Sequence, residues 1–153
     1  MTKRCLYIMT VAAVLLTACD RHTVYNNYEH VPMAGWERSD TLSFDVSPMA
    51  DDGNYQQSLG ISISSKFPFR DVTLVVDQSV HPLFRTLRDT IRCTLFDERG
   101  NIQGTGIGTY QYLFPLRTLR LHRGDSLHIT VHHAMKREAL PGIADVGIIM
   151  SRP

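Results

Sequence analysis

Cysteine is scarce in this sequence, whose 153 residues include three, Cys5, Cys19 and Cys93. Two of them lie within the first 19 residues, so Cys93 has no partner in the rest of the chain and an intramolecular disulfide there is excluded, even in an oxidising compartment. Cys93 lies between Ile91 and Leu95 in an alternating apolar run. This position favours a buried small hydrophobe over a reactive thiol.

Apolar runs long enough to span a bilayer are also missing. The run from Leu6 to Leu16 is shorter than the about 20 residues that a transmembrane helix needs. It follows the basic pair Lys3-Arg4, and a basic start before a short apolar core is typical of a secretory signal. No other segment is long and apolar enough to span, so we expect the rest of the chain to lie outside the bilayer.

The apolar run ends in Leu16-Thr17-Ala18-Cys19, which resembles the bacterial lipobox. The cysteine sulfur of a lipobox takes a diacylglyceryl group, and cleavage frees its amine for a further acyl chain. One chain holds a protein to a membrane only weakly, whereas two or three give a stable anchor. We therefore predict a signal peptide over residues 1–18 and lipid attachment at Cys19. A plain secretory signal with an incidental cysteine is the alternative.

Neither sign of charge dominates the chain. The sequence has 16 basic and 15 acidic residues, and removal of Lys3 and Arg4 with the signal leaves 14 basic residues. A net charge near −1 argues against nucleic acid or anionic lipid as the main partner. The remaining 135 residues suit one domain that buries a core without disulfides or metals.

The segment that follows the predicted lipid site lacks a sustained hydrophobic period. Pro32 and Gly35 interrupt any helix. We predict a lipidated N-terminus and tether over residues 19–39, from which Tyr25, Tyr28 and Trp36 are candidates to dock on the domain or on a partner.

From residue 40 the apolar residues recur with period two, which is typical of strands with one buried face. The clearest alternations are Leu42-Phe44-Val46, Leu59-Ile61-Ile63, Val72-Leu74-Val76, Ile91-Cys93-Leu95, Leu127-Ile129-Val131 and Val146-Ile148-Met150. Residues 102–121 hold a further strand or two, and turn sequences such as Pro141-Gly142 separate the strands. We predict an all-β fold: a single antiparallel β-sandwich of about eight strands over residues 40–153, immunoglobulin-like or jelly-roll-like.

Two stretches suggest ligand sites. His122, His128, His132 and His133 cluster in sequence, but His128 and His132 on one strand face lie about 13 Å apart. Zinc ligands lie about 2 Å from the metal, so we predict exposed histidines and no metal site. The run Gly104-Thr105-Gly106-Ile107-Gly108 precedes strand-forming residues rather than a helix, so a phosphate-binding loop is not expected.

An aromatic stripe follows this glycine run. In a regular strand, Tyr110, Tyr112 and Phe114 share one face with the glycines. The stripe is either part of the core or an exposed surface for a partner or a glycan, with Trp36 as a possible addition. No catalytic motif is visible: the sequence has no G-x-S-x-G, no cysteine with an evident histidine base and no carboxylate singled out by context. We expect neither enzymatic activity nor a cofactor.

Several motifs together resemble the gliding-motility lipoprotein GldH family of the Bacteroidota. They are Met135-Lys136-Arg137 with Leu140 through Gly147, Asp89-Thr90 with Leu95 through Gly100 and Gly104 through Gly106, Tyr28 and Trp36, and Phe67-Pro68-Phe69. Ile102, Asp71 and Ser64-Ser65 depart from the family pattern, which expects tryptophan, asparagine and Arg-Asn there.

This resemblance implies a non-enzymatic component of an envelope machine tied to gliding and to the associated type IX secretion system. It also implies envelope proteins as partners and an outer-membrane location. A glycan-binding envelope lipoprotein is the alternative, and exposure of Tyr110 and Tyr112 separates the two hypotheses.

Overall fold

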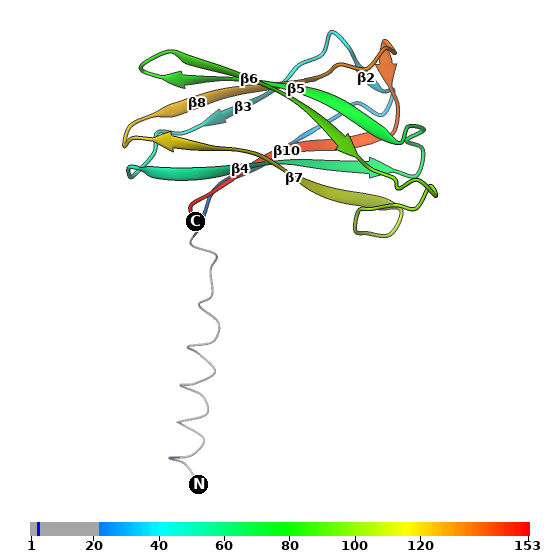
Figure 1. Ribbon diagram of the computed structural model, residues 1–153, viewed down its shortest axis with the longest axis horizontal. Coiled ribbons are helices and arrows are strands. Elements are labelled where there is room, and N and C mark those ends of the chain that lie inside the picture. The colour runs from blue at the N-terminus through cyan, green and yellow to red at the C-terminus, as the bar shows by residue number, and fades with distance from the viewer. Residues whose placement is uncertain (1–2, 4–21) are drawn as a thin grey trace.

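The computed structural model describes residue 3 and residues 22–153. The predicted signal peptide, residue 3 apart, and Cys19 lie outside the described residues. Residues 22–153 form a sandwich of two four-stranded antiparallel sheets with a small two-stranded sheet (Figure 1). The predicted all-β sandwich is confirmed. Among the described residues, no helix is long and apolar enough to cross a membrane.

The first sheet has the strand order β1-β10-β4-β7. Its strands are β1 (Thr23–His30), β10 (Ile143–Ser151), β4 (Gly53–Ser64) and β7 (Thr109–Leu121). The second sheet has the order β3-β8-β5-β6, with β3 (Leu42–Val46), β8 (Ser126–His133), β5 (Asp71–His81) and β6 (Arg85–Thr94). A short pair, β2 (Trp36–Glu37) and β9 (Ala139–Leu140), completes the fold.

The core lies between the inner faces of the two sheets, as the period-two pattern predicts. The residues expected inside one sandwich are all buried: Phe44, Ile61, Leu74, Leu95, Ile129 and Ile148. Cys93 is also buried, and this burial raises the pKa of its thiol to about 12. The interpretation of Cys93 as a small core hydrophobe is therefore confirmed.

The predicted tether over residues 19–39 is wrong from Thr23 onward. Thr23–His30 forms edge strand β1, which pairs antiparallel with β10, and Val31 is buried in the core. The β1 sequence TVYNNYEH lacks apolar alternation: none of its residues is fully buried, and Tyr25 packs only partly buried against the core. The sandwich consequently begins at Thr23 rather than at residue 40.

The turn at Pro141-Gly142 is confirmed. Gly142 has a φ of +87°, a left-handed conformation that glycine adopts without strain. Its carbonyl accepts a hydrogen bond of 2.8 Å from the Ser64 N–H. The turn thus connects β9 to β10 and fixes the last strand beside β4.

Candidate interaction surface

The expected contact residues on β7 and at Trp36 belong mainly to the core. Trp36 has an exposed fraction of 0% and donates its indole N–H to the Asp40 carbonyl at 3.0 Å. Tyr112 is 8% exposed and donates its hydroxyl to the Leu95 carbonyl at 2.7 Å. Desolvation by burial raises the pKa of Tyr112. The interpretation of Trp36 and Tyr112 as surface contacts is therefore wrong.

Tyr110 and Phe114 are half-buried and pack against the same core. The Phe114 ring stacks on that of Tyr112, with centroids 6.0 Å apart. The glycines do not continue this stripe, because Gly104–Gly108 lies in the loop before β7. Gly106 and Gly108 there have φ values of +137° and +78°, which a regular strand does not allow.

The opposite face of β7 is the exposed one, and it continues across its whole sheet as a single row. Tyr28 pairs with Gly147, Gly147 with Gly60, and Gly60 with Leu113, so one residue from each strand lies in this row. Tyr28 and Leu113 are 45% and 62% exposed. The row therefore has Tyr28 at one end and Leu113 at the other, with two glycines between them.

The Tyr28 ring lies directly over the two glycines. A Cβ atom at Gly147 would lie 2.6 Å from the ring atom Cδ1, and one at Gly60 would overlap the Tyr28 hydroxyl. No larger residue fits at either position while the ring stays in place. The pKa of Tyr28 is raised, mainly by desolvation and to a smaller extent by the nearby Asp145 carboxylate. The ring is thus held flat on the sheet with its other side open to solvent.

Six polar residues flank this row together with Ile149 and Pro115. His30 Nδ1 lies 3.0 Å from Asp145 Oδ1 across β1 and β10. We call this surface the Tyr28 face. It comprises Asn26, Tyr28 and His30 of β1, Asp145, Gly147 and Ile149 of β10, Ser58, Gly60 and Ser62 of β4, and Gln111, Leu113 and Pro115 of β7. Tyr28, Gln111 and Leu113 of this face also border a hollow of about 500 Å³, whose other lining residues are Thr94, Gln103, Thr105, Tyr112 and Phe114. The rest of the face is open and suits contact with another surface.

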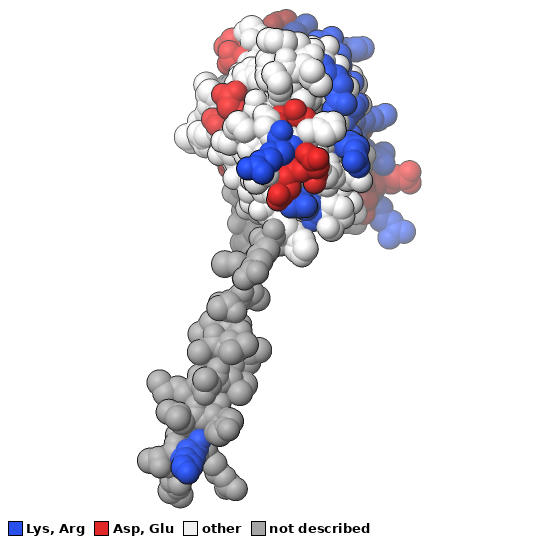
Figure 2. All heavy atoms as spheres, turned by 90° about the vertical axis from the view of Figure 1, so that its left-hand side faces the viewer, with Lys and Arg blue, Asp and Glu red and all other residues white. Residues whose placement is uncertain are grey.

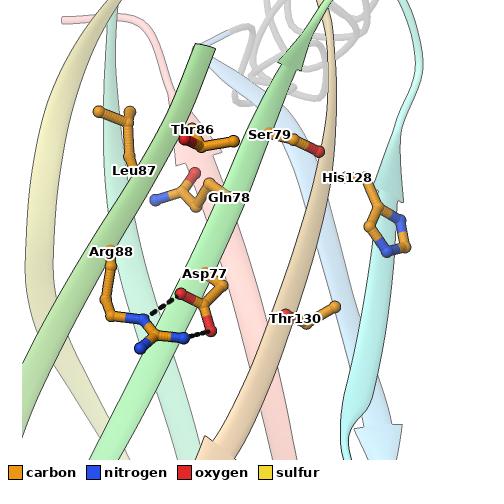
Figure 3. A pocket seen from close by; sticks show the side chains of 8 residues that line it. All are labelled: Asp77, Gln78, Ser79, Thr86, Leu87, Arg88, His128 and Thr130. Atoms are coloured by element: carbon orange, nitrogen blue, oxygen red, sulfur yellow. Dashed lines mark hydrogen bonds and ion pairs between the residues drawn. The ribbon is translucent and has the colours of Figure 1, made fainter. Parts of the chain in front are cut away.

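The outer face of the second sheet has a different character. Here a hollow of about 400 Å³ is lined by Asp77, Gln78, Ser79, Thr86, Leu87, Arg88, His128 and Thr130 (Figure 3). Arg88 binds Asp77 through two hydrogen bonds, of 2.5 and 2.9 Å. The hydrogen bond from Arg88 lowers the pKa of Asp77, so this carboxylate stays ionised and suits an ion pair rather than proton donation.

His128 lies on the far side of the hollow from this pair (Figure 3). Its Nδ1 is 2.7 Å from Asp45 Oδ1 on the neighbouring strand, and no hydrogen bond to Asp77 is present within residues 22–153. The hollow therefore combines the Arg88–Asp77 ion pair with hydroxyl groups, and one of these, the Ser79 hydroxyl, lies 3.2 Å from His81 Nε2.

The prediction of exposed histidines is wrong for His133, which is fully buried. Its Nε2 donates to the Trp36 carbonyl at 3.0 Å, and its Nδ1 accepts from the Met135 N–H at 3.3 Å. These two hydrogen bonds require a neutral His133 ring, and desolvation by burial lowers the pKa of His133. Within residues 22–153, no three histidine, cysteine or carboxylate side chains are arranged to hold a metal ion.

Two features of the Tyr28 face lie outside the sequence-based expectation. Tyr28 lies in the predicted tether, and the sequence gives Gly60 and Gly147 no expected role on the surface. The sequence does place glycine inside two apolar strands, which suggests close approach of another group. The identity of that group depends on the register of β1 against β10.

The fold and this surface define a small β-sandwich domain with one flat, partly apolar outer face. The chain belongs to the GldH lipoprotein family, whose model matches residues 23–150. Membership of a lipoprotein family supports a membrane-anchored location in the cell envelope.

Two relatives cover nearly the whole chain. It is 26% identical over 147 residues to the gliding motility lipoprotein GldH of Flavobacterium johnsoniae, covering 92% of this chain and 91% of that one. It is 19% identical over 150 residues to a GldH homolog of Christiangramia forsetii, with the same coverage of 92% and 91%. A family 35 carbohydrate binding module from Clostridium thermocellum has a TM-score of 0.39 at 13% identity, covering 80% of this chain and 90% of that one, a likeness too weak to support any conclusion.

Proposed function

We propose that this protein is a lipid-anchored, non-enzymatic subunit of an envelope assembly that serves gliding motility and the associated type IX secretion machinery. Lipid on Cys19 holds it to the outer membrane, and envelope proteins are its partners. Membership of the GldH lipoprotein family and the gliding-motility names of two relatives support this proposal.

The observation that carries a contact role is the Tyr28 face. Its central row combines a flat aromatic ring, a floor of two glycines and the exposed side chain of Leu113. Glycines let a partner backbone approach closely, and Tyr and Leu supply apolar area that a partner buries. Tyr is among the residues in which interface energy concentrates. The face therefore fits a protein partner that packs flat against the first sheet.

Site-specific photocrosslinking in the native organism tests this contact. A photoreactive amino acid replaces Leu113 on the Tyr28 face and, as a control, Thr90 on the outer face of the second sheet, where Thr90 is exposed. We expect a discrete adduct with an envelope protein from position 113 and none from position 90. Equal adducts from both positions, or none from position 113, would remove the Tyr28 face as the contact.

The anchor is tested separately. Cys19→Ala removes the sulfur that accepts lipid, so a fatty-acid analogue fed to cells should label the wild-type protein and leave the variant unlabelled. Equal labelling of the two would contradict lipid attachment at Cys19.

Glycan binding is less well supported. It required exposed, roughly coplanar rings at Tyr110 and Tyr112, whereas Tyr112 is buried and Tyr110 is half-buried. We therefore favour a protein partner.

A further inference from the structure

The tip of the β5–β6 hairpin exposes two large apolar side chains. Leu83 and Phe84 are 79% and 74% exposed, and the Phe84 ring touches only the edge of His81 among the ring contacts of residues 22–153, with centroids 4.8 Å apart. Phe84 also has a φ of +52°, a left-handed conformation that is unfavourable for a bulky residue and natural for glycine or asparagine. The exposed side chains of Leu83 and Phe84 therefore add little to the core, and the left-handed backbone of Phe84 does not stabilise the fold.

This tip lies at the end of the sandwich where the described chain begins. Strand pairing places the start of β1 beside the end of β10, since Thr23 pairs with Ser151. It places the end of β5 beside the start of β8, since Val80 pairs with Leu127. In Figure 1 the β5–β6 tip and the connections β3–β4 and β7–β8 lie together at the left. The tip and the entry of the chain therefore share one end.

The chain is fixed to this end only three residues after Cys19. The His22 carbonyl accepts a hydrogen bond of 2.7 Å from the Arg152 N–H. Three residues span at most about 10 Å. The link between the lipid and the domain is therefore much shorter than the tether expected from the sequence. With strands about 4.8 Å apart and sheets about 10 Å apart, the β5–β6 tip lies roughly 15 Å from β1 across this end. Lipid on Cys19 would therefore bring the tip to the membrane surface.

Arginines accompany the apolar tip. Arg85 follows Phe84 directly, and its Nη2 lies 3.4 Å from the Arg120 carbonyl. Arg85 and Arg120 are exposed, and neither forms an ion pair within residues 22–153. Figure 2 faces this end and shows Lys and Arg side chains gathered along one side of it. Apolar side chains beside guanidinium groups suit a phospholipid surface, where the former enter the acyl boundary and the latter bind phosphates.

We propose that Leu83 and Phe84 insert into the phospholipid leaflet that holds the anchor, with Arg85 and Arg120 at the phosphate level. This inference rests on the proposed lipid anchor at Cys19. The sandwich then stands with its strands steeply inclined to the membrane. The Tyr28 face runs along its side, and the loop around Ile107, at the start of β7, lies farthest from the lipid.

Fluorescence quenching in vesicles tests this insertion. The lipidated protein carrying Leu83→Cys is labelled with a polarity-sensitive dye and reconstituted into phosphatidylethanolamine–phosphatidylglycerol vesicles that contain lipids brominated on the acyl chains. Cys93 stays unlabelled because it is buried with a raised pKa. Ile107→Cys is the matched control, since Ile107 is 101% exposed at the opposite end.

We expect a blue-shifted, strongly quenched dye at position 83 and an unshifted, unquenched dye at position 107. Phe84→Gly in the Leu83→Cys background should weaken the quenching without lowering thermal stability, because glycine tolerates the positive φ. Protein that floats with the vesicles but shows no more quenching at 83 than at 107 would overturn the insertion alone. Protein that fails to float would overturn the anchor and the insertion together.

Discussion

The side-chain amides of Gln57 and Gln78 exchange two hydrogen bonds across the core, of 2.8 and 2.9 Å, and thereby join the two sheets. Both residues are 2% exposed. Buried amides are costly unless paired, and each of these satisfies the other. At the β6 and β7 edge, Arg117 and Asp89 form a second polar connection between the sheets.

Substituting both glutamines should lower the free energy of unfolding by less than the sum of the two single substitutions. Gln57→Met or Gln78→Met leaves one buried amide without its partner, which typically costs about 1–3 kcal/mol. The double variant removes both amides and should lose clearly less than the sum of the singles. Urea denaturation of all four proteins measures this coupling, and additive losses would contradict the reciprocal pair.

The turn before β10 should not accept a β-branched residue. Gly142→Val combines a strained positive φ with a Cβ that would lie 2.5 Å from the Phe67 backbone nitrogen. Left-handed strain and overpacking together should lower the free energy of unfolding by about 3 kcal/mol or more. Ala144→Ser, at the start of β10 and only half-buried, should change little. Similar urea midpoints for the two variants would contradict this account of the turn.

Stability should depend on pH through His133. Burial lowers its pKa in the folded protein, whereas the unfolded chain has the ordinary value of 6.5. The unfolded state therefore binds more protons below about pH 6.5. The contribution of the neutral ring is fully present above that pH and is lost as the pH falls toward the lowered folded pKa.

Urea midpoints at pH 7.5 and at pH 5.0 check this dependence. The wild-type protein should lose more stability between these values than His133→Gln, which cannot titrate. An identical loss in both proteins would show that His133 is not the group responsible.

Apolar alternation predicted the core well, and its failures have specific physical causes. Leu74 and Ile129 lie inside because the residues two positions before and after each of them are apolar. Strand β7 is ambiguous because both of its faces carry apolar residues, Tyr112 and Phe114 on one and Leu113 and Pro115 on the other. Composition cannot decide which face turns inward, and a one-residue change of register reverses the answer.

The Tyr28 face and the position of Trp36 depend on contacts distant in sequence. Trp36 is buried through contact with His133, 97 residues away, whose ring meets it edge-on at 5.4 Å. Tyr28 gains its role from Gly147 and Gly60, which become neighbours only when β1, β10 and β4 pair. The polar sequence of β1 gives no indication of that pairing.

The most direct test of the central claim is a quantitative pull-down of the lipidated protein from native membranes, with partners identified by mass. Leu113→Arg places a charge on the Tyr28 face without disturbing the core, because Leu113 is 62% exposed. Thr90→Arg is the control on the other sheet. We predict that both variants keep the wild-type melting temperature, that Thr90→Arg retains the envelope partner, and that Leu113→Arg loses it. A folded Leu113→Arg protein that recovers the same partners in the same amounts as the wild type would contradict the account.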